Sequence, residues 1–142
     1  MFADDIILGY KVCKFDSKGR LFLPKFTYAE KDDEICITKE NDMFLGLYNY
    51  NKLKSKINGL KKESLTSKNK EIIQLIESQL EEIYTKFITS SIVDAQRRLL
   101  IPKEVISSQN LSEYIILQGA NDYARVFSDE KSYNEYVKKY RK

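Results

Sequence analysis

A ten-residue motif that pairs an acidic with a basic side chain occurs twice in this chain. Residues 16–25 (the first motif) read DSKGRLFLPK, and residues 94–103 (the second motif) read DAQRRLLIPK. Both fit Asp-x-x-x-Arg-Leu-x-aliphatic-Pro-Lys, and the 2 prolines of the chain stand at the same place in the two motifs. An Asp and an Arg at this spacing can face each other across a tight turn, so the carboxylate can hold the guanidinium in one orientation. The sequence therefore predicts two oriented arginines, Arg20 and Arg98.

Two interpretations of such an arginine compete. It can brace a hairpin, although an exposed ion pair contributes only about 0–1 kcal/mol. It can also meet phosphates or the O6/N7 edge of guanine, and a β-ribbon that carries it can enter a major groove. One motif alone favours the bracing role. Two motifs shift the balance towards binding, because they present two arginines at related positions.

The residues around both motifs are mostly basic, which suits a nucleic-acid partner. The candidate DNA-binding residues are Lys14, Lys18, Arg20, Lys25, Arg97, Arg98 and Lys103. Asp16 and Asp94 would orient the arginines, and Gly19 would allow a positive φ in the first turn. A net charge of +3 over 142 residues is only weakly basic. Solvated lysines explain it as well as a nucleic-acid partner does.

The composition argues against several other classes of function. The chain has 0 histidines, which removes the commonest general base and zinc ligand. It has no glycine-rich phosphate loop and no paired carboxylates in a catalytic pattern. Cys13 and Cys36 lack Cys-x-x-Cys spacing and are expected to be small buried side chains of a reducing compartment. We therefore expect no enzymatic activity, no cofactor, no metal and no small-molecule substrate.

The expected location is the cytoplasm. No apolar run approaches the length needed to span a bilayer, and the initial MFADD lacks the basic start of a signal peptide. If the chain binds DNA, it would be associated with the nucleoid, with no membrane partner. The basic residues 138–142 are interpreted as charges that favour a helix C-terminus, rather than as a nucleic-acid or membrane contact.

The repetition predicts two related halves of roughly 45 residues each, which are too small to fold separately and should pack together. Each half is read as strand, turn, strand, short helix, strand, turn, strand, helix. Strands are expected at 8–15, 20–23, 34–38, 43–48, 87–93, 98–101, 114–118 and 123–127. Helices are expected at 25–31, 49–58, 69–87 and 103–108 and after Ser128, with a polar connection at 59–68. These many short strands suit antiparallel pairing in a mainly β, α+β domain.

The segment 69–87 is the clearest helix in the sequence. Its apolar side chains recur on one helical face: Ile72, Ile76, Leu80, Ile83 and Phe87. We expect this stripe to pack on the core rather than to bind a ligand. For the preceding helix, Asn49 or Asn51 is the expected N-cap.

Both motifs resemble the two signatures of the MraZ family of bacterial transcriptional regulators. Three other segments also resemble that family: the Gly-Tyr at 9–10, TKENDMFLGLY at 38–48, and residues 115–127 with the SDEKSY that follows. The resemblance covers essentially the whole chain, in order. The second motif has Arg97 where the family usually has glycine, which leaves open whether its turn and DNA contact are preserved.

The resemblance implies two pseudo-symmetric AbrB-like swapped-hairpin β-barrel halves with flanking helices. It divides the single domain 1–142 into a first half at 7–58, a connecting helix at 59–86 and a second half at 87–142. It also implies a ring-shaped homo-oligomer that binds tandem repeats in double-stranded DNA upstream of cell-division and cell-wall genes, with Arg20 and Arg98 facing the DNA. The alternative is an oligomeric scaffold of the same fold without specific DNA binding, which the altered second motif and the low net charge motivate.

Overall fold

The computed structural model describes residues 6–141; the acidic start at 1–5 and the last basic residue, 142, lie outside the described residues. The strands are β1 (Ile7–Lys14), β2 (Arg20–Phe22), β3 (Glu34–Lys39), β4 (Phe44–Asn49), β5 (Phe87–Ile92), β6 (Arg98–Leu100), β7 (Tyr114–Asn121) and β8 (Ala124–Phe127). The helices are α1 (Tyr50–Thr66), α2 (Lys70–Lys86), α3 (Lys103–Ser108) and α4 (Glu130–Val137), with a 3₁₀ turn η1 (Lys25–Thr27). The predicted mainly β, α+β class is confirmed.

The strand order of the larger sheet is symmetric between the two halves. Replacing each strand by the corresponding strand of the other half, and reading from the opposite edge, gives the same order. The larger sheet is open and antiparallel, in the order β1-β7-β8-β4-β3-β5, while β2 and β6 form a second sheet of two strands. The first strand of each half, β1 or β5, pairs with the third strand of the other half, β7 or β3. This exchange of strands agrees with a swapped-hairpin arrangement of two halves.

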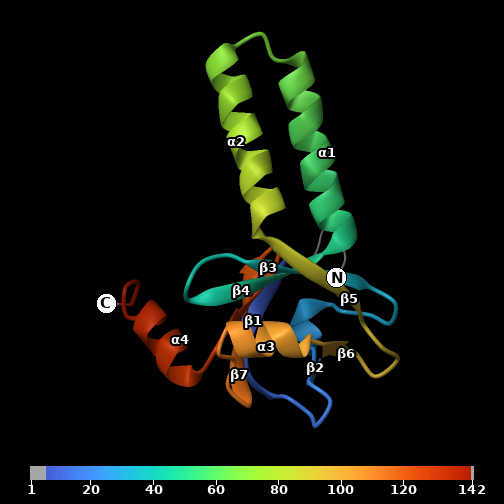
Figure 1. Ribbon diagram of the computed structural model, residues 1–142, viewed down its shortest axis with the longest axis vertical. Helices are drawn as coiled ribbons and strands as arrows, with labels where there is room; N and C mark the ends of the chain where they lie inside the picture. The colour runs from blue at the N-terminus through green and yellow to red at the C-terminus, as the bar shows by residue number, and fades with distance from the viewer. Residues whose placement is uncertain (1–5, 142) are drawn as a thin grey trace.

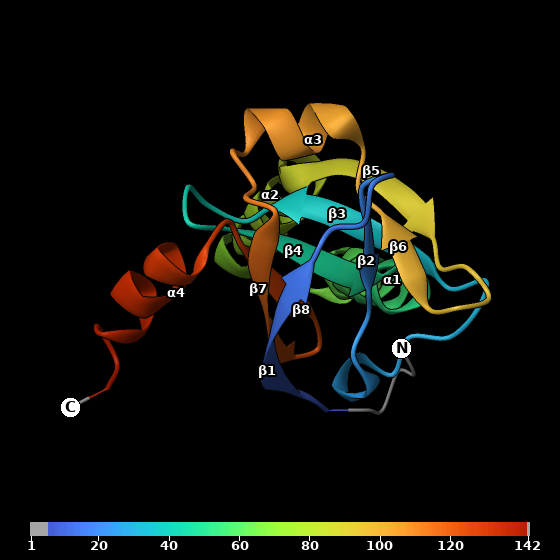
Figure 2. The ribbon, with the colours of Figure 1, turned by 90° about the horizontal axis from the view of Figure 1, so that it is seen from below.

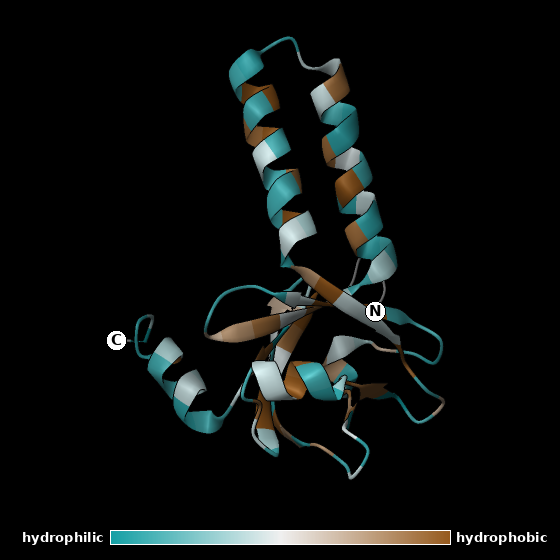
Figure 3. Ribbon diagram, in the orientation of Figure 1, coloured by the Kyte–Doolittle hydropathy of each residue, from teal (hydrophilic) through white to brown (hydrophobic). Residues whose placement is uncertain are grey.

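One hydrophobic core joins the two halves. Leu21 from β2 and Leu99 from β6 are buried in the same cluster as Ile35 of β3 and Ile115 of β7. Because both halves contribute to this cluster, neither could bury its apolar side chains alone. In Figure 3, brown (hydrophobic) segments occur in many of the strands below the helical hairpin.

Both cysteines are buried and unpaired, as predicted. Burial, and then the nearby charge of Glu34, raises the pKa of the Cys36 thiol to about 11. The thiolate form that reacts with oxidants or metals is therefore disfavoured.

The helices α1 and α2 form a hairpin that rises from the sheet (Figure 1). The polar connection predicted at 59–68 is wrong, because α1 continues to Thr66 and only residues 67–69 separate it from α2. Lysine, leucine and glutamate are good helix formers, and their summed preference outweighs the single Gly59. At the other end, Asn49 is the N-cap: its side chain accepts hydrogen bonds from the backbone N–H groups of Asn51 and Lys52.

The apolar stripe of α2 packs chiefly on α1, and the expectation that it would pack on the central core is wrong. Ile76 and Leu80 are buried, but neither belongs to the cluster that joins the halves. A helix that projects from the sheet can bury its apolar face only against its partner helix.

Two shorter elements also differ from the sequence-based expectation. The helix expected at 25–31 is only the 3₁₀ turn η1, which ends because Tyr28 adopts a φ of 56°. The N-cap of α4 is Asp129 rather than Ser128: its carboxylate accepts a hydrogen bond from Ser132 N–H at 2.7 Å. A carboxylate at a helix N-terminus also interacts favourably with the helix dipole.

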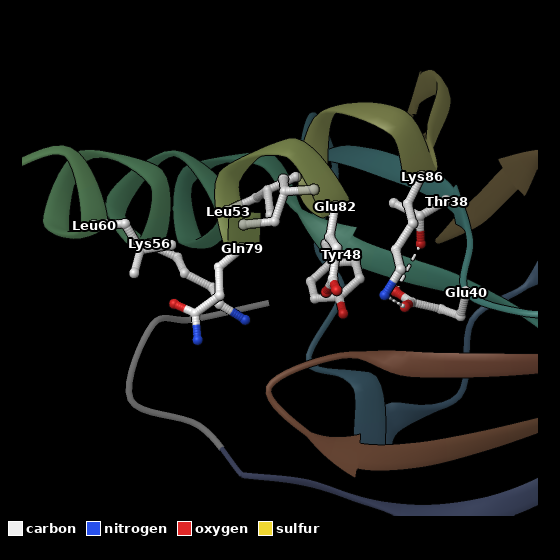
Figure 4. Close-up of a pocket in the computed structure, with 10 residues that line it drawn as sticks. Thr38, Glu40, Tyr48, Leu53, Lys56, Leu60, Gln79, Glu82 and Lys86 are labelled. Atoms are coloured by element: carbon white, nitrogen blue, oxygen red, sulfur yellow. Dashed lines mark hydrogen bonds and ion pairs between the residues drawn. The ribbon is translucent and has the colours of Figure 1, made fainter. Parts of the chain in front are cut away.

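A polar cluster fixes the base of the helical hairpin to the sheet (Figure 4). The Nζ of Lys86, at the end of α2, lies 3.4 Å from Glu40 Oε2, and Thr38 Oγ1 donates a hydrogen bond to Glu40 Oε1 at 3.0 Å. Gly46 leaves space for this carboxylate, because a Cβ there would lie 2.8 Å from Glu40 Oε1. The orientation of the hairpin therefore depends on a short set of contacts at its base.

Candidate nucleic-acid interface

The Asp16 carboxylate closes the turn of the first motif. Its Oδ1 accepts hydrogen bonds from the backbone N–H groups of Lys18 and Arg20 at 3.0 and 2.9 Å. Its Oδ2 accepts one from the side-chain Nε–H of Arg20 at 2.7 Å. Gly19 completes the turn with a φ of 82° and donates its N–H to the Asp16 carbonyl at 3.0 Å.

The second motif has the same hydrogen bonds. Asp94 Oδ1 accepts from the backbone N–H groups of Gln96 and Arg98 at 2.9 and 2.8 Å, and Oδ2 accepts from Arg98 Nε at 2.7 Å. Arg97 stands where Gly19 stands in the first motif, and it keeps the turn with a φ of 58°. A left-handed conformation costs a residue with a Cβ roughly 1–2 kcal/mol, so the arginine is tolerated here at some expense of stability.

Hydrogen bonding keeps both carboxylates ionised. The pKa of Asp16 is lowered chiefly by the hydrogen bond from the Arg20 backbone N–H, with the Arg20 side chain adding to the effect. The pKa of Asp94 is lowered in the same way by Arg98. Each aspartate, which is ionised at neutral pH in any case, therefore keeps its negative charge to a more acidic pH while it holds its arginine through Nε.

The two motifs meet in the β2–β6 ribbon. Figure 2 shows these two strands side by side. Leu21 pairs with Leu99, and both are buried in the core. Side chains alternate along a strand, so Arg20 and Arg98, one residue away on each strand, lie on the opposite, outer side of the ribbon. The two arginines are thus presented on one surface.

Two apolar side chains lie beside them on that surface. Phe22 pairs with Arg98, and Leu100 pairs with Arg20. Phe22 is 60% exposed and Leu100 is 46% exposed. The Arg98 guanidinium carbon lies 6.0 Å from the centre of the Phe22 ring, which limits the directions in which the arginine can point.

The turn residue of each motif also holds the other motif. The Arg97 carbonyl accepts a hydrogen bond from Leu23 N–H at 2.8 Å, and the Gly19 carbonyl accepts one from Ile101 N–H at 3.0 Å. The relative position of the two turns is therefore fixed by backbone contacts between the halves.

The guanidinium groups retain unused donors. Arg20 and Arg98 are about three-quarters buried, with exposed side-chain fractions of 26% and 22%. Their Nε atoms bond to aspartate, and within residues 6–141 no hydrogen bond from their Nη groups to protein is found. Those Nη groups can meet a phosphate or a guanine edge.

The other candidate residues lie around the ribbon in different settings. Lys18, Arg97 and Lys103 are exposed. Lys25 and Arg97 line one hollow of about 370 Å³ with Lys31, so the structure brings a lysine of the first motif beside an arginine of the second. By contrast, Lys14 forms an ion pair with Glu113 at 3.4 Å. The hydrogen bond from Lys14 to Glu113 raises the pKa of the lysine ammonium group.

Three residues of this surface were missed by the sequence reasoning. Phe22, Leu100 and Lys31 were not among the candidates. The alternation of buried and exposed positions in β2 and β6 is the signal that could have pointed to Phe22 and Leu100. No local signal marks Lys31, which reaches the surface through the loop after η1.

No model of a known protein family matches the chain. Comparison with individual proteins does find relatives. The chain is 28% identical over 123 residues to the transcriptional regulator MraZ of Clostridium acetobutylicum, covering 84% of this chain and 81% of that protein. It is 26% identical over 133 residues to the transcriptional regulator MraZ of Christiangramia forsetii, covering 88% and 79% respectively.

The chain is therefore similar, over most of its length, to transcriptional regulators named MraZ. The matches span most of both relatives, so the likeness to MraZ is not confined to the two motifs. In this chain the second motif carries an arginine at its turn, and the turn keeps the hydrogen bonds of the first.

The described residues give no support for a metal site or for a membrane-spanning helix. Residues 6–141 contain no group of three or more His, Cys, Asp or Glu side chains placed to hold a metal ion. Across the same residues, none of the helices has the length and apolar character that a bilayer crossing requires.

Proposed function

We propose that this protein is a transcriptional regulator, not an enzyme, and that it binds double-stranded DNA through the β2–β6 ribbon and its two turns. The observation that carries this proposal is the placement of Arg20 and Arg98 on one outer surface, each held through Nε by an aspartate. The two relatives, each named a transcriptional regulator, support the same role.

The arginines would make the contacts that depend on geometry. Their Nη groups would meet a guanine edge or clamp a phosphate. Lys18, Arg97 and Lys103 would add phosphate contacts, which position the protein without reading sequence. Lys25 would act from the hollow that it shares with Arg97, while Lys14 would contribute least because Glu113 already neutralises it.

Affinity would come from many weak sites acting together. One subunit offers a single small ribbon and a net charge of +3. A ring of subunits would present several ribbons at once, and tandem DNA repeats would then be bound at high effective concentration. Such an assembly would act in the cytoplasm, at the nucleoid, on promoters of cell-division and cell-wall genes.

The test is fluorescence-anisotropy binding to DNA from upstream of the protein's own gene, with scrambled DNA as the competitor. Arg20→Ala should weaken specific binding by about 1–3 kcal/mol, because an oriented arginine that reads a base is worth that much. Lys61→Ala, an exposed lysine of α1 far from the ribbon, is the matched control and should bind as the wild type does.

Salt dependence separates the regulator from the scaffold alternative. Specific binding through phosphates should weaken steeply with salt, because each neutralised phosphate releases counterions. Equal weak binding to both DNAs, unchanged by Arg20→Ala, would reject the ribbon as a DNA-binding surface and favour a scaffold of the same fold.

A further inference from the structure

A second hollow lies away from the ribbon, between α4 and the outer face of the large sheet. Its volume is about 470 Å³, within the range of small-molecule sites. Figure 2 shows α4 projecting from the sheet on the side opposite β6. Its lining includes Gln118, Arg125, Tyr136, Tyr140 and Arg141.

Arg125, at the floor of this hollow, is a half-buried cation to which residues 6–141 offer no carboxylate partner. Its Nε donates to the Tyr123 hydroxyl at 2.8 Å, and its Nη1 donates to the Tyr136 hydroxyl at 3.3 Å and to Gln118 Oε1 at 3.5 Å. Arg20 and Arg98, by contrast, are each paired with an aspartate. Among the described residues no acidic side chain forms an ion pair with Arg125, although burial of a charge favours such pairing.

Aromatic rings hold the Arg125 guanidinium in place. Its central carbon lies 4.8 Å from the centre of the Phe44 ring and 5.5 Å from the ring centres of Tyr123 and Tyr136. Both tyrosine hydroxyls accept hydrogen bonds from Arg125. Their own O–H groups therefore stay available as donors.

The rim of the hollow repeats this combination of ring and cation. Tyr140 is 70% exposed, and its ring centre lies 5.4 Å from that of Tyr136. Arg141, the next residue, is also exposed. An aromatic face and two guanidinium groups thus converge on one space.

We propose that this hollow binds a small planar aromatic ligand that carries an anionic group, either a phosphate or a carboxylate. The anionic group would pair with Arg125 and Arg141, whose planar forks suit both anions. The ring would stack on Tyr136 or Tyr140, and the Gln118 amide NH2 would donate a hydrogen bond at its edge, because its oxygen already accepts one from Arg125. The proposal does not depend on DNA binding, because none of the lining residues belongs to the ribbon.

A smaller hollow, of about 250 Å³, is less suited to such a ligand. It lies at the base of the helical hairpin (Figure 4), and its carboxylate, Glu40, is already paired with Lys86 and Thr38. Arg125 differs because the opposite charge that would complete its surroundings is absent from the described residues.

The test is isothermal titration calorimetry of the full chain with AMP and with 4-hydroxybenzoate, which provide the phosphate and carboxylate forms of the ligand. Adenosine and inorganic phosphate provide the two halves of AMP separately. The variants are Arg125→Lys, which keeps the charge but removes the fork, and Arg141→Gln at the exposed rim. Lys131→Gln is the control, because it removes one charge from α4 without touching the hollow.

We expect at least one of the two anions to bind, with each half of AMP binding more weakly than AMP itself. Arg125→Lys and Arg141→Gln should each weaken binding at least tenfold, and Lys131→Gln should leave it unchanged. If Arg125→Lys fails to fold, as circular dichroism would show, Arg141→Gln decides the question. No binding at millimolar concentration, equal loss in Lys131→Gln, or tighter binding of an acidic peptide such as Glu-Tyr-Glu than of both anions would overturn the proposal.

Discussion

At the scale of the residue, the common feature of the two motifs is one carboxylate that accepts three hydrogen bonds. In each turn an aspartate accepts two backbone N–H groups and one arginine Nε–H. The carboxylate therefore builds the turn and orients the arginine with the same atoms. A change at either aspartate should affect local structure and arginine orientation together.

Acid should weaken the fold through these aspartates. The folded-state pKa of Asp16 and of Asp94 is lowered from 3.8, so their stabilising contribution is complete above the unfolded pKa and is lost as the pH falls through the folded value. We expect the melting temperature of the wild type to fall below about pH 4. The double variant Asp16→Asn, Asp94→Asn should be less stable at pH 7 and should lose less on acidification. Asp42→Asn, in an exposed turn, is the control; a pH profile of the double variant that parallels wild type would contradict the assignment.

Arg97 should lower the stability of the fold while adding a positive charge that helps DNA binding. Arg97→Gly should raise the free energy of unfolding by up to about 1 kcal/mol, because glycine adopts the φ of 58° without strain while losing more chain entropy on folding. The same variant should bind DNA more weakly, with a salt slope reduced by about one if Arg97 contacts a phosphate. Gln96→Gly, next to it and without a positive φ, should destabilise the chain. Urea denaturation and anisotropy measure the two effects; lower stability of Arg97→Gly would refute the strain argument.

At the scale of the element, the helical hairpin is long and is attached by few contacts. Asn49 caps the N-terminus of α1, and the ion pair of Lys86 with Glu40 holds the C-terminal end of α2 to the sheet. Between these points α2 packs its apolar stripe mainly on α1. The base of the hairpin is therefore the place where a small change should have the largest effect.

A pair of glycine variants tests this dependence. Gly46→Ala should destabilise the fold by about 1–3 kcal/mol, because the new Cβ would lie 2.5 Å from Thr38 Oγ1 and 2.8 Å from Glu40 Oε1. Gly59→Ala, in α1 with nothing within 4 Å of the new Cβ, should stabilise it by about 0.5–1 kcal/mol. Urea denaturation gives both values. A neutral Gly46→Ala would show that the Glu40 cluster does not hold the hairpin.

At the scale of the whole molecule, the sheet order implies that the two halves are related by a pseudo-twofold arrangement. The pairing of β2 with β6 is centred on Leu21 and Leu99, so each arginine has an equivalent in the other half. This arrangement gives one subunit two similarly placed arginines. An assembly of subunits would multiply the contacts with DNA that we propose for them.

The number of DNA repeats should control affinity if the assembly binds as proposed. We expect DNA with three repeats to bind at least about tenfold more tightly than DNA with one, since linked sites gain from effective concentration. Anisotropy on DNAs of equal length, with the extra repeats scrambled in the control, measures the difference, and light scattering gives the mass of the assembly. Equal affinity for one and three repeats would contradict a multivalent mode.

The features that the sequence determined by itself are those set by neighbouring residues. The Asp-to-Arg contact, the cap at Asn49, the α3 helix and the buried cysteines all depend on short spacings or on local polarity, and they could be predicted from the residues alone. The mainly β class followed from the number and shortness of the strands. The limits of the two halves and the DNA-binding role of each candidate residue stay predictions.

Only the tertiary structure decided which distant segments meet. The pairing of β2 with β6 placed Arg20 and Arg98 on one surface, and the approach of the two turns brought Lys25 beside Arg97. The sequence pattern also gave no sign that Arg125 would lie among three rings, with no acidic partner in the part of the chain that the structure describes. Contacts of this kind join residues far apart along the chain, and they form because both halves must bury their apolar side chains in one shared core.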